Sequence, residues 1–218
     1  MSTDPSIETL RIREAAAGDL DGIARIYGTL WCNTLRSRGD IEDAELAARF
    51  NVAMQLQDSP IALVAESDGE VIAACMVGVF DDGAPRPNPA WQQAYDELLA
   101  QATARAETAD AKLEGSLFGD SREKATSRRF AATGNPYAQG QVNLIIIDPA
   151  WQGRGLGRRL IDAARGHLRD LGCSAFFLMT DNQSDYAFYD HIGMERIAED
   201  HSQDTGDGFT VYIYGDAC

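Results

Sequence analysis

The chain has 218 residues, 44% of them hydrophobic, and a formal net charge of −15 at pH 7. The length and the apolar content predict one globular domain with a sizeable core. The negative charge argues against a nucleic-acid partner, because phosphate backbones recruit basic surfaces. The chain contains no run of about 18 apolar residues, so we expect no membrane span. Met1 to Pro5 contain neither a basic residue nor an apolar block, so we expect no signal peptide and a cytoplasmic protein.

The first part of the chain predicts a strand, two helices and a hairpin. Alternation over Thr9–Arg13 predicts the strand, and apolar spacing predicts helices that begin at Asp19 and span Ile41–Gln57. The apolar runs Ile61–Ala65 and Val71–Phe80 flank an Asp-Gly pair. Because that pair is a strong turn signal, the two runs predict an antiparallel hairpin.

Residues 81–140 interrupt this pattern. Pro85, Pro87 and Pro89 indicate a loop, and Trp91–Glu114 has apolar residues at helical spacing. A structureless stretch of that length is uncommon in a compact domain. We therefore predict a mostly helical insertion between two sheet strands. The sequence leaves open whether this insertion caps a substrate site, forms a homodimer contact or only packs against the rest of the domain.

After the insertion, strands and helices alternate. The predicted strands are Gln141–Ile147, Ser174–Met179 and Thr210–Tyr214, and the predicted helices are Gly155–Leu171 and Asp185–Ile192. This order of elements predicts a mixed α/β fold in a single domain over residues 1–218. The four cysteines are scattered without a C-x-x-C pair, which predicts reduced thiols and no metal motif.

A glycine-rich turn joins the first of these strands to its helix. Gly153, Gly155 and Gly157 stand at alternate positions. The N–H groups of such a turn and the positive end of the helix dipole form a phosphate site. Arg158 occupies the place of the last glycine in the dinucleotide motif, and no P-loop lysine follows. A tight turn that serves only close helix packing is the alternative explanation.

A second motif lies near the C-terminus. Asn182 and Tyr189 are seven residues apart, and Gly193 and Met194 follow them. Because seven residues make about two helical turns, the two side chains would share a face of any helix that joined them.

The two motifs together resemble those of the Gcn5-related N-acetyltransferase (GNAT) superfamily, although Met194 stands where the family usually has phenylalanine. The resemblance covers roughly Thr9–Phe80 and Gln141–Tyr214 and leaves out residues 81–140. It implies a mostly antiparallel central sheet flanked by helices. It also implies an enzyme that transfers an acetyl group from acetyl-CoA to a primary amine by direct attack. An acyl-CoA-binding or regulatory module without turnover is the alternative, and a dinucleotide-binding oxidoreductase is a weaker one.

The resemblance also implies roles for particular residues. Tyr189 would be the general acid that protonates the leaving thiolate, with Tyr186 as the second candidate. The backbone of the strand at Ile145–Ile147 would pair with the pantetheine arm of the cofactor, and Asn182 would hold the cofactor through its amide. The implied cofactor-binding residues are Ile145, Ile146, Ile147, Gln152, Gly153, Arg154, Gly155, Leu156, Gly157, Arg158 and Asn182.

The general base is not evident in the sequence. Some family members carry a glutamate five positions before the asparagine, where this chain has Phe177. The central strand offers Asn143 and, at its end, Asp148, which we expect to be structural. A chain of water molecules is one candidate for the general base. The carboxylates that remain as candidates are Glu66, Asp81, Asp82 and those of the insertion.

The sequence also leaves the identity of the acceptor amine open. From Asp181 to Cys218 the chain has nine carboxylates and one arginine. A negative surface of this kind favours a cationic amine, either a small molecule or a peptide end. A solvated surface that maintains solubility is the alternative.

Overall fold

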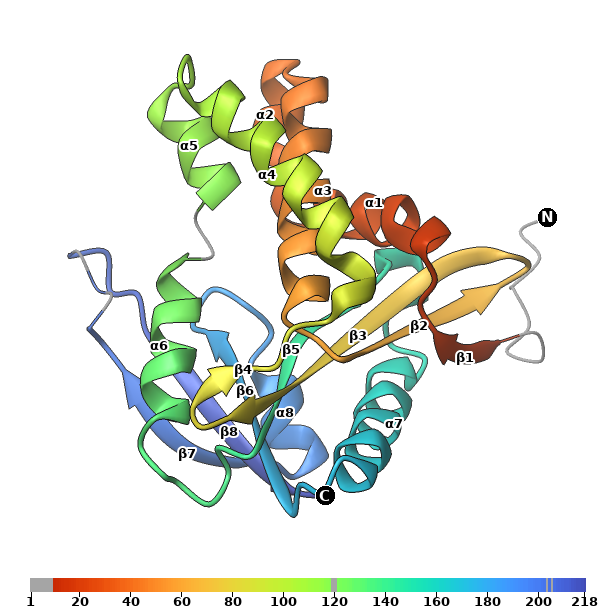
Figure 1. The fold of residues 1–218 in the computed structure, drawn as a ribbon, viewed down its shortest axis with the longest axis vertical. Coiled ribbons are helices and arrows are strands. Elements are labelled where there is room, and N and C mark those ends of the chain that lie inside the picture. Colours follow the sequence, from red (N-terminus) through yellow and green to blue (C-terminus); the bar gives the residue numbers. More distant parts are fainter. Residues whose placement is uncertain (1–9, 119–120, 203, 205) are drawn as a thin grey trace.

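The computed structural model describes residues 10–118, 121–202, 204 and 206–218 (Figure 1). Thr9, with which the first predicted strand begins, and Met1 to Pro5 lie outside the described residues. No helix in the described ranges is long and apolar enough to cross a membrane.

One eight-stranded sheet forms the centre of the protein. The strand order is β1-β2-β3-β5-β6-β8-β7, with the short β4 paired to β3. All neighbouring strands are antiparallel except β5 and β6, which are parallel. The prediction of a mixed α/β fold with a mostly antiparallel sheet is therefore confirmed. The strands are β1 (Arg11–Glu14), β2 (Ile61–Ser67), β3 (Glu70–Asp81), β4 (Ala84–Pro85), β5 (Gly140–Ile147), β6 (Ala175–Asp181), β7 (Glu195–Asp200) and β8 (Val211–Ala217).

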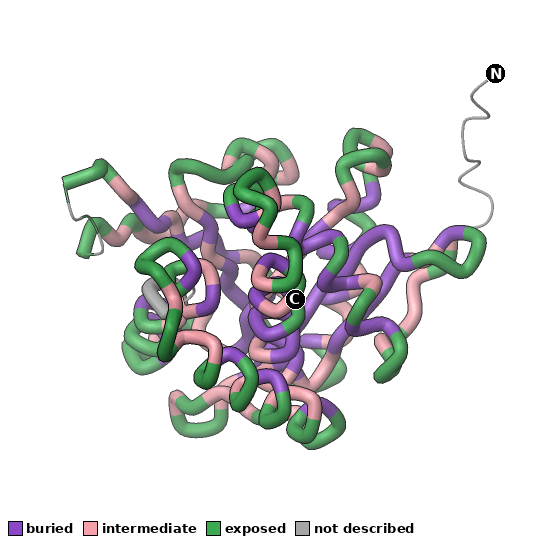
Figure 2. The backbone as a smooth tube through the Cα atoms, turned by 90° about the horizontal axis from the view of Figure 1, so that it is seen from above, coloured by how far each residue is buried: buried purple, intermediate pink, exposed green. Residues whose placement is uncertain are grey.

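Helices cover both faces of this sheet (Figure 1). They are α1 (Leu20–Trp31), α2 (Asn33–Arg38), α3 (Ile41–Gln57), α4 (Gln92–Ala106), α5 (Ala111–Phe118), α6 (Ser121–Ala131), α7 (Leu156–Asp170) and α8 (Ala187–Ile192). Along β3, Ala74 and Met76 pack with α1 and α3, whereas Cys75 and Val77 pack with α7. Both faces of β3 are thus buried, which explains its nearly continuous apolar sequence. Figure 2 shows the resulting distribution, with buried residues along the sheet and exposed residues on the outer loops and helices.

The single helix predicted over Trp91–Glu114 is wrong, because the chain breaks into α4 and α5. Asp110 lies at the break, and its carboxylate accepts hydrogen bonds from the backbone N–H groups of Lys112 and Leu113. Such a cap satisfies the first free N–H groups of a new helix, so it fixes the start of α5. Helix α4 packs on α3 rather than on the sheet: Trp91, just before α4, is buried, and the Tyr95 ring stacks 6.2 Å from that of Phe50.

The elements α2, β4, α6 and β7 were not predicted. Strand β7 pairs only with β8, so it is an edge of the sheet. Charged side chains suit an edge strand because they discourage pairing with other chains. In β7 they also interrupt the alternation of apolar and polar residues by which a strand is recognised in a sequence. Helix α6 lies against the same end of the sheet, where the Phe130 ring is 4.7 Å from that of Phe177. The carboxylate of Asp200 accepts hydrogen bonds from Thr126 and Arg129 of α6.

These contacts predict an acid-sensitive link between α6 and β7. Burial by itself raises the pKa of Asp200, but hydrogen bonds from Ser202, Thr126 and Arg129 outweigh it and hold the pKa well below its ordinary value of 3.8. A carboxylate with a lowered folded-state pKa stabilises the protein above pH 3.8, and this stabilisation is lost as the pH falls toward the folded-state value. We expect Asp200→Asn to lower the unfolding free energy at pH 7, and the difference from wild type to shrink below pH 4, as measured by urea unfolding. A pH-independent difference would contradict this.

Candidate functional site

The site is built where β5 and β6 separate. The two strands pair at only two positions, Gln141 with Phe177 and Val142 with Leu178. Beyond them β5 continues to Ile147 and β6 to Asp181 without further pairing to each other. Because parallel strands leave unpaired N–H and C=O groups wherever they separate, this opening exposes backbone that can bind an extended ligand.

A bulge in β5 marks the start of the opening. Met76 pairs with Leu144 and Val77 with Val142, so Asn143 has no partner in the register. The Asn143 amide donates to the Asp58 carbonyl at 3.0 Å and to the Ser59 hydroxyl at 2.8 Å, just beyond the end of α3. The bulge therefore ties the opened strand to a helix on one face of the sheet.

The glycine turn closes one end of the opening. Gly155 has φ +74° and precedes the first residue of α7, and Gly153 has φ +75°. Gly153, Gly155 and Gly157 line the same cavity as Ile145–Ile147. At Gly153 and Gly155 glycine adopts the left-handed conformation without strain and lets a ligand approach the backbone. The first N–H groups of α7 have no acceptor within the helix, so the turn can bind an anion.

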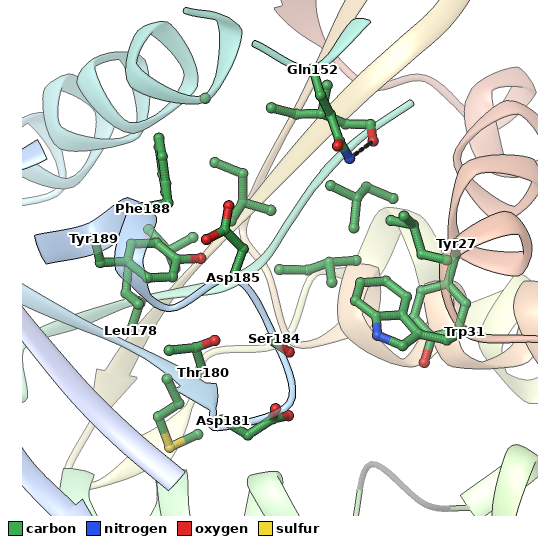
Figure 3. Close-up of a pocket in the computed structure, with 18 of the residues that line it drawn as sticks. Tyr27, Trp31, Gln152, Leu178, Thr180, Asp181, Ser184, Asp185, Phe188 and Tyr189 are labelled. Atoms are coloured by element: carbon green, nitrogen blue, oxygen red, sulfur yellow. Dashed lines mark hydrogen bonds between the residues drawn. The ribbon is translucent and has the colours of Figure 1, made fainter. Parts of the chain in front are cut away.

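Tyr189 lies across the opening on α8. The residue is 9% exposed, and its ring lies 5.2 Å from that of Phe188 and 5.4 Å from that of Tyr214. Figure 3 shows its hydroxyl directed into the cavity, toward the part that Asp185 also faces. The packed ring fixes the position of the hydroxyl, which is what a proton donor in a site requires.

A cavity of about 1070 Å³ connects these features. We call the part at the glycine turn the donor end. We call the part walled by the end of α1, by α5 and by the loop after β6 the acceptor end. The acceptor end is lined by Tyr27, Leu30, Trp31, Cys32, Gly115, Ser116, Asp181, Ser184, Asp185 and Phe209.

The insertion contributes to this acceptor end through α5. The amide of Asn51, a buried residue of α3, donates to the Ser116 carbonyl at 2.9 Å and to the Ala47 carbonyl at 2.8 Å. This bond holds α5 against α3, so that Gly115 and Ser116 border the cavity.

Most of the residues predicted for the cofactor lie together. The cavity is lined by Ile145, Ile146, Ile147, Gln152, Gly153, Gly155, Leu156, Gly157 and Tyr189. Arg154 and Arg158 are not among the lining residues. The Arg154 guanidinium lies 5.1 Å from the Trp151 ring, and Arg158 is exposed. Any contact of these two side chains with a cofactor stays a prediction.

No helix joins Asn182 to Tyr189, so the two side chains do not share a helical face. Helix α8 begins only at Ala187, and Asn182 lies just after β6. The Asn182 amide donates to the Gly208 carbonyl at 2.8 Å and accepts from the Thr210 N–H at 3.2 Å. In this structure Asn182 therefore ties the loop after β6 to the start of β8, outside the cavity lining, and its contact with a cofactor stays a prediction.

The carboxylates considered as the base lie elsewhere. Glu66 pairs with Arg13 at 2.6 Å, and Asp81 pairs with Arg86. Asp148 pairs with Arg25 at 2.8 Å and accepts a hydrogen bond from the Ala150 N–H, as expected for a structural residue. None of these carboxylates, nor Asp82, lines the cavity.

Two carboxylates that the sequence analysis did not single out do line the cavity, Asp181 and Asp185. They flank Asn182 in the second motif, and they were counted only as part of the acidic C-terminal region. Tyr27 and Trp31 were missed as site residues as well. They lie one turn apart on α1, with rings 4.6 Å from each other, and this i, i+4 spacing is the signal that was available.

Comparison with known proteins agrees with this geometry. The family model described as Acetyltransferase (GNAT) family matches residues 91–194. Mycothiol acetyltransferase of Rhodococcus jostii is 44% identical over 69 residues, which are 31% of this chain and 23% of that protein. Mycothiol acetyltransferase of Thermomonospora curvata is 29% identical over 206 residues, which are 87% of this chain and 64% of that protein. The match thus spans less than two thirds of the length of each of these curated relatives.

The fold is similar to solved structures of the same kind. A putative acetyltransferase from Salmonella typhimurium, solved with its cofactor acetyl-CoA, has a TM-score of 0.51 and 15% identity, covering 96% of this chain and 94% of that one. The chain is thus similar in sequence to the GNAT family over residues 91–194 and to a curated acetyltransferase over 87% of its length, and it shares the fold of the solved structure. The family match begins at Trp91 and so includes most of residues 81–140. This corrects the expectation that the insertion lies outside the resemblance.

The bulge provides a test of how the site is built. A Cβ atom at Gly78 would lie 2.7 Å from the Asn143 side-chain nitrogen, which is closer than side chains pack. We expect Gly78→Ala to push the Asn143 amide away from Asp58 and Ser59 and to lower the unfolding free energy by about 1–3 kcal/mol. Gly18→Ala is the control, because a Cβ there meets nothing within 4 Å. Equal stability of the two variants in urea unfolding would contradict the prediction.

Proposed function

We propose that this protein is an N-acetyltransferase that takes an acetyl group from acetyl-CoA and transfers it to a primary amine by direct attack. One observation carries the proposal: the opening between β5 and β6 joins an anion-binding helix terminus to a buried tyrosine hydroxyl in one cavity. A ligand that spans both must carry a phosphate at one end and a reactive group several bonds away, as acetyl-CoA does.

The donor end fits the cofactor. Its pyrophosphate would bind the N–H groups between Gly153 and Gly157, where the α7 dipole favours negative charge. Its pantetheine arm contains amides that can pair with the backbone of β5 at Ile145–Ile147 in the manner of an added strand. These assignments use backbone, so the side chains of the three isoleucines remain free to pack in the core.

The chemistry follows from this placement. A neutral amine nitrogen attacks the thioester carbon, the C–N bond forms, and the carbonyl oxygen gains negative charge that a backbone N–H of β5 would stabilise. The C–S bond then breaks, and the thiolate takes the proton of the Tyr189 hydroxyl. The nitrogen, now bonded to the acetyl carbon, gives its extra proton to water, and the Tyr189 phenolate regains a proton from solvent. Holding the two reactants side by side supplies most of the acceleration, and the positioned acid adds to it.

We infer that the enzyme works in the cytoplasm without a metal. The four cysteines Cys32, Cys75, Cys173 and Cys218 are free thiols, which suits a reducing compartment. Burial raises the pKa of the Cys75 thiol to about 12, so this residue is unreactive core material.

A non-catalytic acyl-CoA-binding module is the second candidate. Its support is Phe177, which stands in place of a glutamate base and is fully buried between the rings of Phe80 and Phe130. Calorimetry with acetyl-CoA and NAD, followed by a thiol-release assay over a panel of amines, separates the candidates. Acetyl-CoA binding with thiol release supports the enzyme, binding without release for any amine supports the module, and preferential NAD binding contradicts both.

The glycine turn provides the first test of the donor site. Gly155 is left-handed and faces open space, so Gly155→Ala adds backbone strain of about 1–2 kcal/mol and no clash within the protein. We expect about tenfold weaker coenzyme A binding by calorimetry, because the strain loosens the turn and the new methyl group obstructs the phosphate. Gly166→Ala, within α7 and also in open space, should bind as wild type does. Unchanged affinity of Gly155→Ala would place the phosphate elsewhere.

Tyr189 provides the second test. Tyr189→Phe removes the proton donor and keeps the packed ring, so we expect kcat to fall about a hundredfold while acetyl-CoA affinity stays within twofold of wild type. Tyr186→Phe is the matched control, because Tyr186 packs against Tyr212 and Arg196 and does not line the cavity. An unchanged kcat in Tyr189→Phe would remove the acid role from this residue.

A further inference from the structure

The two ends of the cavity differ in charge. The donor end lies at the N-terminus of α7, which carries partial positive charge. Asp181 and Asp185 border the acceptor end, and within the described ranges no lysine or arginine lines the cavity. Since the donor is a polyanion, the carboxylates do not serve it, so they face the second substrate.

These two carboxylates are available to a ligand. The Asp185 carboxylate has no hydrogen-bond or ion-pair partner in the part of the chain that the structure describes, whereas the carboxylates of Asp43, Asp58 and Asp148 are each paired with an arginine or lysine. One oxygen of Asp181 accepts a hydrogen bond from the Gln183 N–H at 2.7 Å, and the other is left for a ligand.

Two aromatic residues of α1, Tyr27 and Trp31, form a wall of the cavity opposite Asp185 (Figure 3). Trp31 is 49% exposed, although it lines the cavity and its ring lies 4.6 Å from that of buried Tyr27, at a tilt of 50°. Figure 3 shows this pair on the far side of the cavity from Asp185 and Tyr189. The face of an indole ring attracts both cations and apolar groups, so carboxylates on one side and tryptophan on the other form a site for an organic cation.

The cation held there is not the reacting nitrogen. An adjacent carboxylate stabilises an ammonium group in its charged form, whereas the attacking amine must be neutral. The two carboxylates are therefore better suited to bind a second cationic group of the substrate. The attacking amine nitrogen is then left neutral and can approach the thioester. Gly115 and Ser116, which Asn51 holds in place, also line the cavity.

We propose that the acceptor is a small amine that carries a second cationic group, and that Asp181 and Asp185 hold this group opposite Trp31. The inference rests on the proposed acetyl transfer and names its substrate class. In this proposal Asp181, Asp185 and Trp31 determine substrate specificity and do not bind the acetyl donor.

The test compares putrescine with butylamine, which share a four-carbon chain and differ by one cationic group. We expect wild-type kcat/KM for putrescine to exceed that for butylamine, and the preference to fall about fivefold in Asp185→Asn and again in Asp181→Asn, because an exposed ion pair contributes about this much. The putrescine advantage should also shrink with added salt. Asp170→Asn, the same change at an exposed site outside the cavity, should leave both substrates unchanged.

Calorimetry of putrescine with the coenzyme A-loaded protein measures the same preference without turnover. Binding that is tighter than for butylamine and weakened by Asp185→Asn supports the proposal, even if neither amine is acetylated. Equal binding and equal kcat/KM for the two amines, or a clear preference for a peptide N-terminus without charged side chains, would overturn it while leaving the acetyl transfer intact. Absence of thiol release with every amine would overturn the acetyl transfer itself.

Discussion

The separation of β5 from β6 is the constraint on which the rest of the site depends. Two parallel strands that pair at two positions and then part leave a gap that the sheet cannot close. The surroundings hold this gap open. The bulge at Asn143 anchors β5 toward α3, and the full pairing of β6 with β8 anchors β6 on the other side. The opening between the strands is therefore a consequence of strand pairing, and the sheet fixes its position.

The helices around the gap are fixed by the same sheet. Arg25 of α1 donates to the Asp148 carboxylate at the end of β5 and to the Val71 carbonyl at the start of β3, both at 2.8 Å. This clamp sets the position of α1 along the sheet and so brings Tyr27 and Trp31, less than two turns further on, to the acceptor end. Asp148 thus has a positioning role although it does not line the cavity. Removal of its carboxylate would release α1, the helix that carries Tyr27 and Trp31.

The sequence predicted the parts of the site that are local in the chain. The glycine turn follows its strand directly, and Tyr189 belongs to a short motif. Residue spacing was therefore enough to identify both as candidate site residues. The acceptor end could not be found in this way, because Tyr27, Ser116 and Asp185 come from three separate segments that only the folded sheet unites. The same limit explains the errors in the fold. The cap at Asp110 divides a helix whose apolar pattern is continuous, and β7 is recognisable as a strand only through its pairing with β8.

The net charge of −15 raises the question of how this protein could hold a polyanion. A cluster of lysines at the cavity would attract phosphate, but it would also repel a cationic second substrate from the neighbouring acceptor end. Backbone N–H groups at a helix terminus avoid this conflict, because their partial charges act over a short range and fall off within one turn. The field of the many carboxylates then still acts on the acceptor. In the function proposed above, the glycines of the turn and the aspartates of the cavity are thus two parts of one arrangement, in which backbone geometry would bind the anion and charge would bind the cation.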